Sequence, residues 1–189
     1  MIRIGILGDI GSGKSYVAKN FGYPVFNADA EVGKLYKKDR KIFNELKKVL
    51  PKYIHSFPVN KNEISNAILA NKSNLKKIIK IVHLEIRKKM NIFLSKNKSK
   101  KIVILDIPLL LENKINKKND ILVFIKSKKL DILKRLKKRE SFNLKLLRKF
   151  KNIQLPLDYK KKKSQFIIKN NFTKNPVKIG VRRIIREIL

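Results

Sequence analysis

The chain begins with residues 1–15, MIRIGILGDIGSGKS, and this stretch decides the fold. Residues 2–7 form a short apolar run that is typical of a buried strand. Residues 8–15, GDIGSGKS, follow at once and match the pattern GxxxxGKS. A helical pattern then runs from about Lys14 to Phe21. Because the glycine-rich stretch lies between a strand and a helix, the sequence predicts a phosphate-binding loop, or P-loop.

The P-loop predicts nucleotide binding through its backbone and two of its side chains. Backbone N–H groups at a helix N-terminus cradle phosphate oxygens, and glycines let the chain approach them closely. We expect Lys14 to reach the β and γ phosphates of ATP and Ser15 to ligate Mg²⁺ through its hydroxyl. The expected ATP-binding residues of the loop are Gly11, Ser12, Gly13, Lys14, Ser15 and Tyr16.

The other apolar segments predict a parallel sheet that is covered on both faces. Strand-sized segments occupy residues 24–27, 101–106, 121–125 and 165–169. Continuous apolar runs are typical of parallel strands with helices on both sides. A closing helix is expected over residues 177–189. The sequence therefore predicts an α/β fold with a five-stranded parallel sheet flanked by helices.

A helical insertion separates the second and third strands. Residues 31–95 have a helical pattern, in which Asp39 is expected to cap one helix and Ser73 another. With 189 residues, 43% of them apolar, the chain can bury one ordinary core but has no room for a second large domain. We therefore expect a single domain over residues 1–189.

Net charge is the most unusual property of the composition. The chain has 48 Lys and Arg residues against 14 Asp and Glu, which gives a net charge of +34 and suggests a nucleic acid or another anionic partner. The lysines are spread over nearly every segment among abundant Ile and Asn, as expected when A/T-rich codons dominate. Runs such as KKKK at residues 160–163 are interpreted as solvated faces, so no specific nucleic-acid partner is expected.

The composition also limits location and metal chemistry. The chain has no cysteine, so any metal must be held by oxygen or histidine ligands. No apolar run approaches the roughly 20 residues needed to cross a bilayer, and the N-terminus does not resemble a signal peptide. We expect a cytoplasmic protein without a membrane partner, either a monomer or a weak oligomer.

The P-loop alone does not identify a reaction, because GTPases, motor ATPases and small-molecule kinases share it. The chain has no NKxD-type guanine signature and no long insertion of the kind found in helicases. A short chain with helical insertions is what small-molecule kinases use to close over their substrates. These features favour a kinase.

Six segments, taken in order, resemble the dephospho-CoA kinase family along nearly the whole chain. They are IGILGDIGSGKS, PVFNADAEVGKLY, IVHLEIR, ILDIPLLLEN, LKRLKKRE and FIIKNN. The resemblance implies a P-loop kinase fold with a helical substrate-binding insertion and a lid. It also implies that ATP phosphorylates the ribose 3′-hydroxyl of dephospho-CoA, the last step of coenzyme A biosynthesis, with Mg²⁺ as cofactor.

Two acidic positions are candidates for the chemistry. The family's DAD motif reads Asn27-Ala28-Asp29 here, so the resemblance implies that Asp29 accepts the proton of the substrate hydroxyl, alongside the catalytic residues Lys14 and Arg139. The carboxyl end of a strand, where Asp29 is expected, is also where open α/β sheets bind ligands, although a helix N-cap is the alternative. Asp106 ends the third strand and is expected to hold Mg²⁺ directly or through water, or else to be a turn residue.

The resemblance also implies a set of substrate contacts. His83 and Arg87 match the family's HPxIR motif, with Leu84 in place of proline, and are placed on the dephospho-CoA side. The guanidinium of Arg87 suits a phosphate. Leu109 and Glu112 belong to a segment that resembles PLL-x-E, where Glu112 is either a polar contact or a helix cap.

The lid is expected over about residues 135–160, within two basic helices at 130–140 and 143–154. Arg135 and Arg139 fit the family's RxxxR lid helix, which implies that they neutralise charge on the transferred phosphoryl group. Asn170 matches the asparagine that the family places near adenine, although Lys169 precedes it and no glycine follows Asn171.

Two rival functions follow from the same residues. The chain could phosphorylate another small acceptor, such as a nucleoside monophosphate. It could also be a nucleic-acid-binding ATPase, which the charge of +34 suggests and the scattered lysines disfavour.

Overall fold

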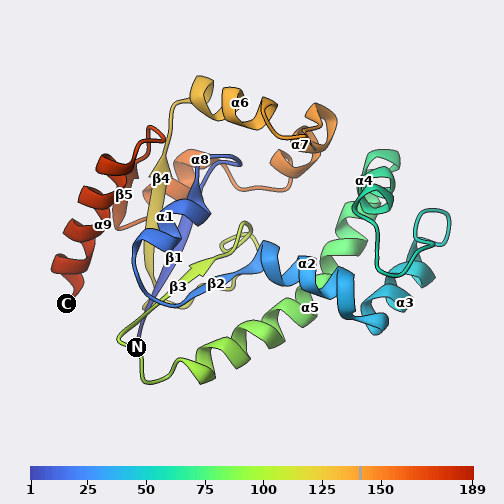
Figure 1. Ribbon diagram of the computed structural model, residues 1–189, viewed down its shortest axis with the longest axis horizontal. Coiled ribbons are helices and arrows are strands. Elements are labelled where there is room, and N and C mark those ends of the chain that lie inside the picture. Colours follow the sequence, from blue (N-terminus) through green and yellow to red (C-terminus); the bar gives the residue numbers. More distant parts are fainter. Residues whose placement is uncertain (141) are drawn as a thin grey trace. The chain divides into compact units, whose positions relative to one another are not determined.

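A computed structural model describes residues 1–140 and 142–189 (Figure 1). The chain divides into two compact units, each built from more than one stretch of sequence. The sheet unit consists of Met1–Asn27, Asn97–Phe142 and Ile153–Leu189, and the helical unit consists of Ala28–Lys96 and Asn143–Asn152. The helical unit thus contains the predicted insertion, and a single domain over the whole chain stays a prediction.

The sheet unit contains five parallel strands, which confirms the predicted fold class (Figure 1). The order β2-β3-β1-β4-β5 places the P-loop strand in the centre. β2 pairs with β3 so that Asn27 lies opposite Asp106. The strands are β1 (Ile2–Gly8), β2 (Val25–Asn27), β3 (Ile102–Asp106), β4 (Ile121–Lys126) and β5 (Phe166–Lys169).

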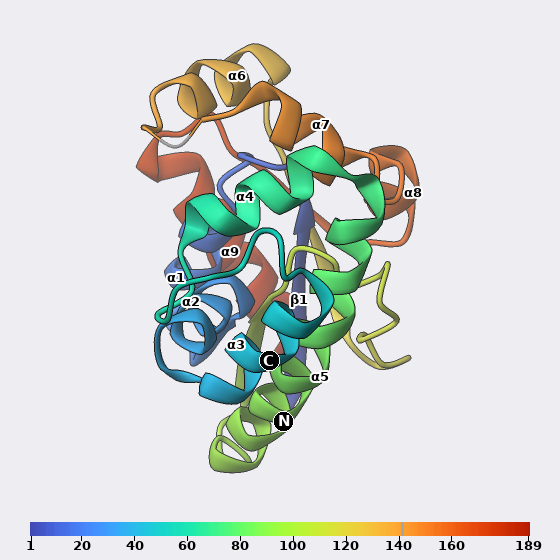
Figure 2. The ribbon, with the colours of Figure 1, turned by 90° about the vertical axis from the view of Figure 1, so that its right-hand side faces the viewer.

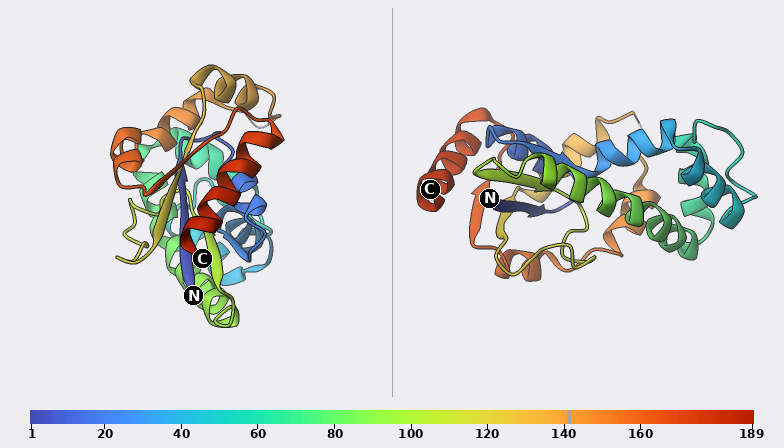
Figure 3. Two further views of the ribbon diagram at one scale, coloured as in Figure 1. Left: turned by 90° about the vertical axis from the view of Figure 1, so that its left-hand side faces the viewer. Right: turned by 90° about the horizontal axis from the view of Figure 1, so that it is seen from below.

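Helices cover both faces of the sheet (Figure 3). α1 (Lys14–Asn20) and α9 (Lys174–Ile188) pack on one face, where Val17 and Val181 are buried against Ile4. α8 (Leu157–Lys162) packs against β1 on the other face. Both chain termini lie at the end of the sheet opposite the P-loop (Figure 3). The P-loop end is therefore the end at which ligands bind in open α/β sheets.

The structure differs from the prediction in the basic segment between β4 and β5. The first basic helix, α6 (Lys129–Lys137), and the second, α7 (Leu144–Lys151), are shorter than expected, and α8 was not predicted as a separate helix. Its first residue, Leu157, follows Pro156, which interrupts the helical pattern. The reading of residues 160–163 as a solvated face is wrong at Lys160, whose side chain is 1% exposed and forms an ion pair.

The helical unit consists of five helices and the loops that join the first four of them. Figure 2 shows these four helices from another side. The predicted cap Asp39 is confirmed, because its carboxylate accepts a hydrogen bond from the N–H of Ile42. The predicted cap Ser73 is wrong, because it lies inside a helix and its N–H donates to the side chain of Asn71. The helices are α2 (Ala28–Lys38), α3 (Arg40–Val49), α4 (Lys61–Ala70), α5 (Lys72–Lys96) and α7.

Lys149 joins α7 to the rest of the helical unit. The Nζ of Lys149 donates to the carbonyl oxygens of Ile68, at 2.7 Å, and Leu69, at 2.9 Å. These carbonyls belong to the last turn of α4, and a lysine is a favourable partner for a helix C-terminus.

Among the described residues, no helix is long and apolar enough to cross a membrane.

Candidate nucleotide-binding site

The P-loop connects β1 to α1 through left-handed glycines. Gly11 and Gly13 have φ values of 85° and 88°, which side chains other than that of glycine seldom adopt. Gly13 is the N-cap of α1, so the first N–H groups of the helix lack intrahelical partners and face the loop. This geometry is suited to an anion.

Lys14 lies over the loop that precedes it. Its Nζ donates to the carbonyl oxygens of Gly8, at 3.2 Å, and Asp9, at 2.8 Å. The Oγ of Ser12 is buried and has no hydrogen-bond partner. The loop therefore holds a cation and an unsatisfied hydroxyl beside the N-terminus of α1, and both suit phosphate oxygens.

Three polar side chains meet at the carboxyl ends of β2 and β3. The Nδ2 of Asn27 donates to Oδ2 of Asp106 and, at 3.4 Å, to Oγ of Ser15. Asp106 is 3% exposed. Within the described chain, no group of three or more His, Cys, Asp and Glu residues could hold a metal. One carboxylate, one hydroxyl and one amide are hard oxygen donors, which fit a Mg²⁺ that keeps several waters.

The ends of β4 and β5 hold the P-loop from the other side. The carbonyl oxygen of Ser12 accepts hydrogen bonds from Nδ2 of Asn170, at 2.8 Å, and from Oγ of Ser127, at 3.1 Å. Asn170 is 2% exposed, so its side chain is buried within the protein. Sequence reasoning missed Ser127, although its position directly after β4 could have indicated it.

α6 contains Arg135, one of the two arginines predicted for the lid. A Cβ on Gly11 would lie 2.9 Å from the side chain of Leu136, so α6 packs against the P-loop. The guanidinium carbon of Arg135 lies 5.0 Å from the ring centroid of Phe172. Arg139 is exposed just beyond the end of the helix. Sequence reasoning also missed Phe172, which follows Asn171 in the chain.

Glu112 forms a buried ion pair. Its Oε1 lies 2.7 Å from Nζ of Lys160 and also accepts from the N–H of Leu155, at 2.9 Å. Its Oε2 is buried without a partner. Leu109, half-buried, lies one turn earlier and accepts from the N–H of Asn113 through its carbonyl oxygen. The ion pair joins this segment to α8, and the predicted substrate contacts of Leu109 and Glu112 stay predictions.

The other predicted substrate residues belong to the helical unit. Asp29 lies in the first turn of α2, two residues after Asn27. His83 and Arg87 are one turn apart in α5. Burial, and to a smaller extent the charge of Arg87, lowers the pKa of His83 below its ordinary value. The Nε2 of His83 is buried and has no hydrogen-bond partner, and the lowered pKa favours the neutral form of the ring.

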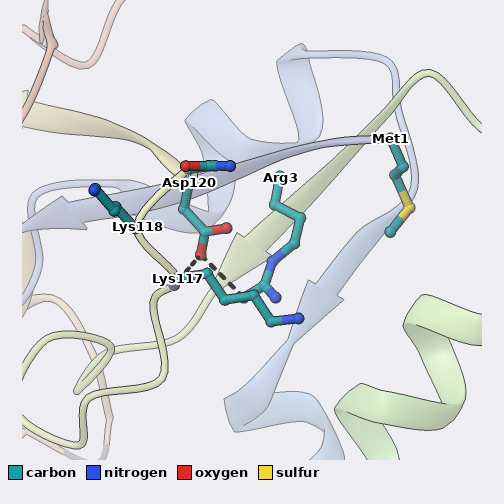
Figure 4. A pocket seen from close by; sticks show the side chains of 6 residues that line it. Met1, Arg3, Lys117, Lys118 and Asp120 are labelled. Atoms are coloured by element: carbon teal, nitrogen blue, oxygen red, sulfur yellow. Dashed lines mark hydrogen bonds and ion pairs between the residues drawn. The ribbon is translucent and has the colours of Figure 1, made fainter.

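The opposite end of the sheet contains a second group of charges. Met1, Arg3 and residues 117–120 line an open depression of about 550 Å³ (Figure 4). There Nη2 of Arg3 lies 2.9 Å from Oδ2 of Asp120, which also accepts from the N–H of Lys117. Burial raises the pKa of Asp120, although these two contacts act against the increase.

Known proteins resemble the chain over most of its length. A family model described as dephospho-CoA kinase matches residues 2–175. A dephospho-CoA kinase from Wolbachia sp. subsp. Brugia malayi (strain TRS) is 35% identical over 127 residues, which are 65% of this chain and 65% of the relative. The match therefore spans just under two thirds of that relative's length.

Two solved structures share the fold. The crystal structure of TT1252 from Thermus thermophilus superposes with a TM-score of 0.80 at 24% identity, covering 100% of this chain and 98% of that one. The dephospho-CoA kinase from Campylobacter jejuni gives a TM-score of 0.64 at 22% identity, with 98% and 96% covered. At these identities the two structures show the fold alone.

Proposed function

Because the chain belongs to the dephospho-CoA kinase family, we propose that it transfers the γ-phosphoryl group of ATP to the ribose 3′-hydroxyl of dephospho-CoA. One observation carries the proposal within the molecule. The P-loop cation Lys14 and the cluster of Ser15, Asn27 and Asp106 lie at the carboxyl ends of neighbouring parallel strands. A phosphate site beside hard oxygen donors is what phosphoryl transfer requires.

The phosphate side of the reaction is assigned to the P-loop. The N–H groups at the start of α1 bind the phosphate oxygens, and Lys14 exchanges the carbonyls of Gly8 and Asp9 for the β and γ phosphates. Ser15 and Asp106 would hold Mg²⁺, with the amide of Asn27 between them. The ion supplies positive charge that offsets the charge of the phosphates. Preorganised charges of this kind stabilise the phosphoryl group in the transition state.

The acceptor side is assigned to the helical unit. Asp29 orients the 3′-hydroxyl and accepts its proton as the oxygen attacks the γ phosphorus, while the bond from that phosphorus to the leaving oxygen of ADP breaks. Arg87 binds a phosphate of dephospho-CoA through its guanidinium. The neutral ring of His83 can donate or accept one hydrogen bond without adding charge.

Residues around the P-loop complete the assignment. Arg135 and Arg139 neutralise charge on the transferred group as a lid, Asn170 holds the loop at the nucleotide, and Tyr16 contributes its backbone. Leu109 and Glu112 form part of the substrate wall, with Glu112 fixed by Lys160. The proposed setting is the cytoplasm, with the enzyme as a monomer or weak oligomer.

A coupled assay of ADP release tests the function. Purified protein with ATP and Mg²⁺ should release ADP rapidly when dephospho-CoA is present and slowly when it is absent. Mass spectrometry of the product should show one added phosphate on dephospho-CoA. Turnover with nucleoside monophosphates and none with dephospho-CoA would instead identify a kinase of another acceptor.

No specific nucleic-acid partner is proposed, despite the net charge of +34. We expect duplex DNA to bind weakly, through nonspecific phosphate contacts that are lost as the salt concentration approaches physiological values. A titration of fluorescent duplex at physiological salt, run beside the kinase assay, checks this. Tight sequence-selective binding, or ATP turnover that depends on DNA, would contradict the assignment of partners.

A further inference from the structure

The turn between β5 and α9 contains an aromatic residue in an unusual conformation. Phe172 has a φ of 66°, in the left-handed region that a bulky side chain seldom adopts. Such conformations persist only where surrounding contacts hold them, and they gather at functional sites. The contacts of Phe172 are therefore informative.

Asn170 fixes the turn to the P-loop. Its Oδ1 accepts from the N–H of Phe172, at 2.9 Å, and its Nδ2 donates to the carbonyl oxygen of Ser12, at 2.8 Å. Asn170 is 2% exposed, so one buried amide links both segments. The position of the Phe172 backbone is thus set by the P-loop itself.

The ring of Phe172 lies directly beside the last glycine of the loop. A Cβ on Gly13 would lie 3.5 Å from Cε1 of Phe172 and 3.2 Å from Nη1 of Arg135. The guanidinium carbon of Arg135 lies 5.0 Å from the ring centroid. Phe172 is only partly buried and Arg135 is exposed, so the contact lies at the surface rather than in the core. A planar ring and a planar cation therefore stand at the edge of the phosphate site.

We propose that Phe172 is the platform on which the base of the bound nucleotide stacks, and that the base displaces the guanidinium of Arg135 from the ring. The proposal rests on the proposed function only in taking ATP as the nucleotide. A triphosphate bound at the P-loop places its base one ribose away from the loop, within reach of its rim. Aromatic rings and guanidinium groups are the side chains on which bases stack.

Two consequences follow from this assignment. Stacking tolerates every base, because each has a π face, so Phe172 contributes affinity for ATP and GTP alike. Displacement from the ring also frees Arg135 to act on the phosphates, which links occupation of the base site to the lid. Phe172 is thus a binding residue and not a catalytic one.

A fluorescent variant tests the stacking directly. The chain contains no tryptophan, so Phe172→Trp introduces a single reporter at the proposed platform. In the absence of dephospho-CoA, ATP should quench its fluorescence, whereas inorganic triphosphate, which competes for the P-loop but has no base, should change it little. An equal response to inorganic triphosphate would overturn the proposal, because the reporter would then sense the phosphates.

Truncation measures the contribution to affinity. Phe172→Gly suits the left-handed backbone, so this variant should keep the fold. We expect it to weaken ATP and GTP binding roughly tenfold or more and to leave inorganic triphosphate binding unchanged. Phe172→Leu, which keeps an apolar side chain without a π face, should lose a similar factor. Affinity for ATP equal to that of the native protein in both variants would contradict the platform.

Controls separate this inference from the proposed function. Ile179→Ala removes an apolar side chain that is 68% exposed on α9 and should leave ATP affinity unchanged. ATP binding that depends on Phe172, without transfer to dephospho-CoA, would refute the proposed function alone. Transfer to dephospho-CoA with ATP affinity unaltered in every Phe172 variant would refute the platform alone.

Discussion

The two ends of the parallel sheet both contain buried polar groups, but their partners differ. At the amino end, Arg3 and Asp120 pair with each other across β1 and the start of β4. At the carboxyl end, Lys14 donates to backbone carbonyls and Asp106 accepts from the amide of Asn27. A direct ion pair neutralises both charges within the protein. Asp106 instead receives a hydrogen bond from a neutral amide, so a metal ion can compete for its charge, and the kind of partner separates a structural carboxylate from a functional one.

Lys14→Ala should produce the largest effect on activity. It removes a cation from a preorganised phosphate site, so turnover should fall by roughly a hundredfold to a thousandfold. The free energy of unfolding should change little, since Lys14 is not part of the core. The ADP-release assay and a urea unfolding curve check both parts. Substantial remaining turnover would contradict the assigned role of the P-loop.

Arg3→Met, at the amino end, should lower the free energy of unfolding and leave turnover unchanged. Removing one partner of a buried ion pair leaves the carboxylate of Asp120 without its cation, which costs about 3 kcal/mol in the free energy of unfolding. Turnover per folded molecule should not change. The double variant Arg3→Met with Asp120→Asn removes both charges, keeps an acceptor for the N–H of Lys117, and should recover most of the loss.

The loss of stability in Arg3→Met should depend on pH. Burial already raises the pKa of Asp120 above its ordinary value of 3.8, and losing Arg3 removes one of the contacts that lower it. The folded variant then binds this proton more tightly than its unfolded chain does, so the contribution of Asp120 to stability is greatest in acid and declines as pH rises through the folded pKa. The difference from the native protein should therefore shrink between pH 7 and pH 4 in urea unfolding. A difference that stays constant or grows in acid would contradict this account of the pair.

The contrast between the two ends also explains what the sequence could predict. The P-loop is local, because its residues are consecutive and its flanking strand and helix have clear patterns, so both fold class and phosphate site could be predicted. The pairs Arg3–Asp120 and Lys160–Glu112 join residues far apart in the chain. Nothing in the local pattern around Lys160 separates it from the solvated lysines beside it.

The departures from the family pattern were visible in the sequence, but their consequences were not. Asn27 is an amide in place of the carboxylate of the DAD motif, and only the pairing of β2 with β3 places it against Asp106. The sequence also shows that Phe172, and not a glycine, follows Asn171. The position of the Phe172 ring over the P-loop depends on the buried side chain of Asn170, which is a tertiary contact.

The smallest effect is expected from adding a charged side chain at the carboxyl end of the sheet. Asn27→Asp places a second carboxylate beside Asp106, where the amide of Asn27 now donates a hydrogen bond. Without Mg²⁺ the two carboxylates repel, so the variant should be less stable than the native protein by about 1 kcal/mol. With Mg²⁺ that difference should disappear, because the ion attracts both. The Mg²⁺ concentration for half-maximal activity should fall severalfold, up to roughly tenfold. Asn27→Ala, which removes the amide without adding charge, is the matched control and should not lower it. An unchanged or higher requirement in Asn27→Asp would show that residue 27 does not act at the metal.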